Sequence, residues 1–83
     1  MDETNPLLGE EMNKVVRNQI KQNDPPETKQ TYDRLIKEGF PKEEVMRQLA
    51  LVVAAEIYDV MKNKEPFNEE RYIIRLNNLP EEP

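Results

Sequence analysis

The stretch Pro41–Lys62, PKEEVMRQLALVVAAEIYDVMK, decides the fold, because it contains the longest apolar run in the chain. The β-branched valines favour a strand locally, but the length of the pattern, with no glycine or proline inside it, favours a helix. The sequence therefore predicts a long helix over residues 42–62 that the rest of the chain surrounds. Its main apolar stripe is Val45, Met46, Leu49, Ala50, Val53, Ile57, Val60 and Met61.

Capping and breaking residues predict three further helices. Asn5 and Asp24 are suited to cap the first and second helices, Gly39 to end the second and Asn68 to cap the last. We expect the first two helices to pack antiparallel across their short turn. The fold class is all-α, a small bundle of three main helices plus a short C-terminal helix, over residues 6–22, 25–38, 42–62 and 69–78.

The length and charge of the chain limit its organisation and its partners. With 83 residues, we expect one helical domain over residues 1–83, with a flexible tail at 80–83. The chain is acidic, with 17 acidic against 12 basic side chains, and both signs are spread along its length. A nucleic-acid binder gathers its basic residues on one face, so we expect no nucleic-acid partner.

The apolar stretches are too short and the start of the chain too polar for a membrane or secreted protein. The uncharged run Gln48–Ala55 is far below the ~20 residues that span a bilayer, so we expect no membrane association. Met1-Asp-Glu3 has neither the cationic nor the apolar part of a secretory signal. The absence of cysteine fits a reducing compartment. These observations favour a cytoplasmic protein.

The sequence lacks most of the side chains that carry catalysis. It contains no His, Cys or Ser, which excludes the common zinc sites and the Ser/His and Cys/His nucleophile pairs. Its two glycines, Gly9 and Gly39, stand apart, so no glycine-rich loop can bind a phosphate. We assign no catalytic residue, metal site or cofactor, and the composition favours a protein that is not an enzyme.

Short motifs occur along the chain: Asn5-Pro-Leu-Leu8, Gln19, Asp24-Pro-Pro26, Tyr32 and Leu35, Glu44-Val45, Gln48, and Glu56-Ile-Tyr-Asp59. Together they resemble a small bacterial helical family known only as a domain of unknown function. The resemblance implies an all-helical fold and no particular activity. Relatives tend to carry histidines that are absent here, where the matching positions hold Gly9, Asn13, Glu43 and Arg47, so no metal site is transferred.

Two polar residues, Gln19 and Glu56, lie within apolar helix faces. Glu56 falls between Val45 and Leu49 on a helical wheel, and Gln19 falls within the stripe of the first helix. A structural reading pairs the two, directly or through a shared Arg or Tyr, because buried polar groups need partners. A functional reading gives Glu56 a raised pKa for acid–base work, or a hard cation held together with Asp59 and a glutamate of the first helix.

The far side of the long helix carries more apolar residues than a solvent-facing side needs. One reading is a dimer or partner surface, and the other is that neighbouring helices cover it completely. On the predicted helix 69–78, Arg71 and Arg75 could bind an anion with Lys64 nearby, although ordinary ion pairs on a solvated face are the more frequent case. The candidate surface consists of Leu51, Ala54, Ala55, Tyr58 and Ile74.

Two classes of function follow from these residues. The favoured class is a non-catalytic helical interaction or structural protein, acting through a homodimer or a partner-helix surface on the third helix. Its partner would be a second copy of the chain or another protein. The alternative is a carboxylate-based metal-binding or acid–base enzyme centred on Glu56.

Overall fold

The chain folds into four α-helices joined by short connections. The computed structural model describes residues 6–80, and of residues 6–9 only the backbone, so the predicted Asn5 cap and residues 81–83 lie outside it. The described residues contain no strand, which confirms the all-α fold, and each predicted helix end lies within one residue of the observed one. The helices are α1 (Pro6–Gln22), α2 (Pro26–Lys37), α3 (Lys42–Asn63) and α4 (Glu69–Asn77).

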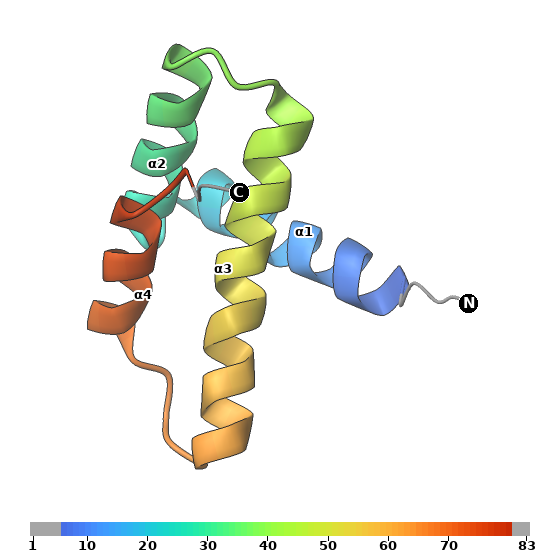
Figure 1. Cartoon of the computed structure of the whole chain (residues 1–83), viewed down its shortest axis with the longest axis vertical. Helices are drawn as coiled ribbons and strands as arrows, with labels where there is room; N and C mark the ends of the chain where they lie inside the picture. Colours follow the sequence, from blue (N-terminus) through green and yellow to red (C-terminus); the bar gives the residue numbers. More distant parts are fainter. Residues whose placement is uncertain (1–5, 81–83) are drawn as a thin grey trace.

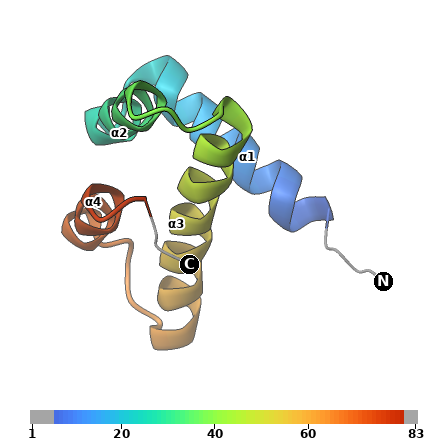
Figure 2. The ribbon, with the colours of Figure 1, turned by 45° about the horizontal axis from the view of Figure 1, so that its top comes forward.

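The long helix α3 is the element on which the other three pack. Figure 1 shows α2 and α4 on one side of α3, with α1 crossing behind it. The expected antiparallel pairing of α1 with α2 is wrong, because α1 lies across both α2 and α3 in the two views (Figures 1 and 2). The N-terminal half of α1 extends beyond α3, away from α2 and α4. No described helix is both long and apolar enough to cross a membrane.

All four helices contribute side chains to one core. The residues of α3 that are buried in it agree only in part with the apolar stripe predicted for this helix. Val52, expected outside the stripe, is buried because α4 packs on that side of α3. Ile57 and Met61, expected inside it, are 40% and 72% exposed. The buried apolar side chains are Val16, Leu35, Val45, Leu49, Val52, Val53, Tyr72, Leu76 and Leu79.

Most of the predicted helix ends have the expected local geometry. Gly39 has φ 103°, and the Gly39 and Phe40 amides donate to the carbonyls of Ile36 and Leu35, which forms a Schellman motif after α2. Asn68 caps α4 by accepting from the Arg71 amide at 2.9 Å. The prediction for Asp24 is wrong: Pro25 is the N-cap residue of α2 and no side chain caps that helix.

An arginine of α2 satisfies the C-terminal end of α4. The Arg34 guanidinium donates to the carbonyl oxygens of Leu76 at 3.2 Å and Leu79 at 2.9 Å. The Leu76 carbonyl is in the last turn of α4 and also accepts from the Leu79 amide, while Leu79 lies just beyond the helix end. A cation is favourable at this end because of the helix dipole. Arg34 thereby ties α2 to α4 in addition to their apolar contacts.

Candidate functional site

Glu56 lies at the junction of α3 and α4, where two arginines enclose it. Its side chain is 3% exposed. Arg71 donates to the two carboxylate oxygens, from Nε at 3.0 Å and from Nη2 at 2.8 Å, and the backbone amide of Asn68 donates to Oε2 at 3.0 Å. Arg75 Nη1 lies 3.5 Å from Oε1, and its Nη2 donates to Asp59 at 2.6 Å. The carboxylate thus holds the first turn of α4 against α3.

The electrostatics of Glu56 are opposite to those of an acid catalyst. The hydrogen bonds from Arg71 hold the pKa of the Glu56 carboxyl below its usual range, despite the burial that acts in the other direction. The same carboxylate raises the pKa of the Arg71 guanidinium. The hypothesis of a raised carboxyl pKa is therefore wrong. Within residues 6–80, no three acidic side chains come together in a way that could hold a metal ion.

Gln19 is the centre of a second polar contact, between α1, α2 and α4. Its Oε1 accepts from the Thr28 hydroxyl at 2.8 Å and from the Tyr72 hydroxyl at 2.7 Å. Thr28 and Tyr72 are almost completely buried. Burial raises the pKa of the Tyr72 phenol above its usual value of 10.0.

Gln19 and Glu56 are therefore hydrogen-bonded to different partners. The described bonds show neither a direct contact between them nor a shared Arg or Tyr; instead, each binds one of two adjacent residues of α4, Tyr72 and Arg71. Sequence reasoning gave Arg71 and Arg75 either a bound anion or ordinary ion pairs on a solvated face, and it missed their pairing with Glu56 and Asp59. Acidic residues three apart on α3 and basic residues four apart on α4 were the signal for it.

Two residues of the predicted partner surface on α3, Leu51 and Tyr58, are exposed, and the exposed row extends further along the helix to Met61. Leu51 is 46% exposed, Tyr58 61% and Met61 72%, and Ala54 lies half-buried between them. These four residues, which we call the outer face of α3, follow a spacing of three, four and three residues. This spacing places them on one side of a helix, as in the contact line of a coiled coil.

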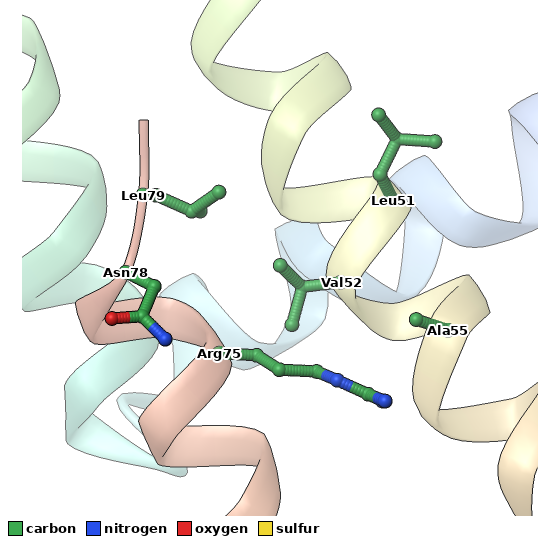
Figure 3. Close-up of a pocket in the computed structure, with 6 residues that line it drawn as sticks. All are labelled: Leu51, Val52, Ala55, Arg75, Asn78 and Leu79. Atoms are coloured by element: carbon green, nitrogen blue, oxygen red, sulfur yellow. The ribbon is translucent and has the colours of Figure 1, made fainter. Parts of the chain in front are cut away.

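The remaining two candidates have different surroundings. Ala55 lies beside the outer face and, together with Leu51, lines a pocket of about 250 Å³ between α3 and α4 (Figure 3). Ile74 is 56% exposed on α4, two residues from the buried Tyr72, and it lines neither this pocket nor the outer face. The lining residues of the pocket are Leu51, Val52, Ala55, Arg75, Asn78 and Leu79.

The pocket is lined by four apolar side chains and by two polar residues, Arg75 of α4 and Asn78 at the C-cap of that helix. Figure 3 shows Arg75 extending from α4 toward α3, below Val52, with Leu79 above them. The guanidinium of Arg75 is engaged with Asp59. The pocket is therefore an apolar recess next to Leu51, and it continues the outer face of α3 toward α4.

Comparison with known proteins identifies one related family. A family model described as a domain of unknown function, DUF1841, matches residues 1–78 of the chain, which includes all four helices. No curated protein and no solved structure matches the chain. The family match carries no activity, so functional conclusions depend on the geometry described above.

Proposed function

The chain belongs to the DUF1841 family, a domain of unknown function, and we propose that it is a non-catalytic interaction protein whose α3 binds another helix. The observation that carries this proposal is the outer face of α3. Three of its side chains expose large apolar areas to solvent, and none of them belongs to the buried core: Leu51, Tyr58 and Met61. A continuous row of such side chains on a small protein is typical of an interface.

The geometry of the ionisable groups supports a non-catalytic role. Glu56 was the strongest candidate for acid–base chemistry, yet it is closed off from solvent and neutralised by Arg71 and Arg75. This arrangement stabilises the attachment of α4 to α3. In this proposal, the ionisable groups around Glu56 therefore stabilise the fold and take no part in chemistry.

Two finer expectations from the sequence stay predictions. One is a cytoplasmic location, which cell fractionation would test. The other is that bacterial relatives carry histidines at the positions of Gly9, Asn13, Glu43 and Arg47, which sequences of such relatives would test.

The proposal predicts that the outer face of α3 is covered inside cells. Hydroxyl-radical footprinting would compare the oxidation of Tyr58 and Met61 in intact cells that produce the protein with their oxidation in dilute purified protein. We expect several-fold protection of both residues in cells, because a bound helix excludes water from them. Phe67, 55% exposed and outside this face, is the internal control and should react equally in both samples. Equal reactivity of Tyr58 and Met61 in cells and in dilution would contradict the proposal.

A further inference from the structure

We infer that the pocket between α3 and α4 binds a small neutral carbonyl compound, in which an apolar part about the size of one ring carries an amide, ester or ketone oxygen. This inference goes beyond the proposed function, because such a ligand is separate from the helix that the outer face binds. It follows from the volume of the pocket, from its apolar lining, and from the donors and charges at its edge.

The pocket has room for a ring and one polar substituent. Its volume is about 250 Å³, whereas an apolar cavity of about 150 Å³ already holds a benzene molecule. Figure 3 shows Leu79 on one side of the recess and the side chains of α3 on the other. An apolar body of this size therefore fits between the two helices. The apolar lining consists of Leu51, Val52, Ala55 and Leu79.

The two polar residues of the pocket supply hydrogen-bond donors to a ligand. A guanidinium has more N–H groups than two bonds use, and the described bonds of Arg75 are those to Glu56 and Asp59. Within the part of the chain that the structure describes, the side-chain amide of Asn78 makes no hydrogen bond. A ligand oxygen that accepts from these N–H groups therefore matches the edge of the pocket.

The charges around Arg75 favour a neutral ligand over an ion. Its guanidinium and that of Arg71 form ion pairs with three carboxylates, so the group has one net negative charge. A carboxylate ligand would gain little from a guanidinium that acidic groups already neutralise, and it would lose its hydration in an apolar pocket. A cationic ligand would lie against the guanidinium itself. The three carboxylates are those of Glu56, Asp59 and Glu65.

The first test compares three ring compounds that differ only in their polar group. Benzamide is neutral, whereas benzoate is an anion and benzylamine a cation at pH 7. Titration of benzamide into the isotope-labelled full chain should shift the NMR signals of the Leu51, Ala55 and Leu79 amides until they saturate. We expect a dissociation constant of roughly 1–10 mM, because so small a ligand forms few contacts. Benzoate and benzylamine should bind more weakly, by roughly fivefold or more.

The second test locates the site with two alanine substitutions. Ala55→Leu fills the recess from α3, so benzamide should bind roughly tenfold more weakly or not at all. Ala54→Leu is the matched control, since Ala54 is also half-buried on α3 but does not line the pocket, and it should leave the affinity unchanged. Circular dichroism would verify that the helices of both variants are intact. Wild-type affinity for benzamide in Ala55→Leu would overturn the location.

The third test changes the charge beside Arg75. Asp59→Asn keeps an oxygen that accepts from Arg75 but removes one of the carboxylates that neutralise it. The affinity for benzoate should therefore rise relative to that for benzamide, by roughly threefold or more. Glu70→Gln makes the same change in net charge at an exposed position of α4 and should leave the ratio unchanged. An unchanged ratio in Asp59→Asn would overturn the preference for a neutral ligand.

The outcomes separate this inference from the proposed function. Tyr58 and Met61 do not line the pocket, so their protection in cells does not depend on the binding of benzamide. If the lining residues show no saturable shifts up to roughly 50 mM benzamide, the inference fails and the proposed function stands. Equal affinities for benzamide, benzoate and benzylamine would overturn the assignment to neutral carbonyl compounds.

Discussion

At the scale of single residues, Glu56 is the side chain whose substitution we expect to change the free energy of unfolding most. Glu56→Gln should lower the free energy of unfolding by about 2 kcal/mol, because it removes the charge that accepts both hydrogen bonds from Arg71, whereas Arg75 keeps its bond to Asp59. This value is below that of a fully buried ion pair, since both guanidinium groups are partly exposed. Urea unfolding at pH 7 would measure the loss. Glu70→Gln, at an exposed position on α4, is the control and should have little effect.

The same residue gives stability a defined dependence on pH. The folded pKa of Glu56 lies below its ordinary value of 4.5, so the folded protein binds fewer protons here than the unfolded chain. Its contribution is fully present above about pH 5.5 and is lost as the pH falls through 4.5 toward the folded pKa. The difference in stability between wild-type protein and Glu56→Gln should therefore shrink between pH 6 and pH 3. A constant difference would contradict this account.

The sequence located these polar residues but not their partners. A helical wheel depends only on spacing along one helix, so it placed Gln19 and Glu56 within apolar faces correctly. Their partners, Tyr72 and Arg71, depend on how α4 is rotated against α3 and α1. That rotation comes from packing of the whole core, and no local pattern encodes it.

At the scale of elements, α4 depends on Arg34 for its C-terminal end. Arg34→Met keeps an apolar stem but removes the donors to the carbonyls of Leu76 and Leu79. We expect amide hydrogen exchange at Asn78 and Leu79 to become several-fold faster, with α1 unchanged, because the last turn of α4 frays. NMR exchange rates would measure it. Lys37→Met, in the exposed last turn of α2, is the control, and equal effects of the two variants would contradict the role of Arg34.

The sequence predicted the helix bounds well because prolines, Gly39 and Asn68 begin or end a helix through their own backbone conformation or side-chain hydrogen bond. It predicted the buried face of α3 less well. Spacing shows which residues share a face, but not how far the neighbouring helices cover it. The last turns of α3 extend beyond α1 and α2 in Figure 1, so Met61 is exposed although it continues the apolar stripe. The exposed Met61 then extends the predicted partner surface.

At the scale of the whole molecule, the contacts of α4 are the most distant along the chain. The bond from the Tyr72 hydroxyl to Gln19 joins residues 53 apart, and the bonds from Arg34 to Leu76 and Leu79 join residues 42 and 45 apart. Closing long loops costs more chain entropy than closing short ones. We therefore expect these contacts to form after the folding transition state, once α1, α2 and α3 have come together.

This order has a consequence for the lifetime of the folded chain. Tyr72→Phe removes one hydroxyl worth about 1 kcal/mol, and Gln19 keeps its bond from Thr28. In stopped-flow experiments we expect roughly fivefold faster unfolding and an unchanged folding rate, because the lost bond is absent from the transition state. Slower folding of the variant would show that α4 joins early. The shortest helix therefore sets how long the native state persists, while the other three set how quickly it is reached.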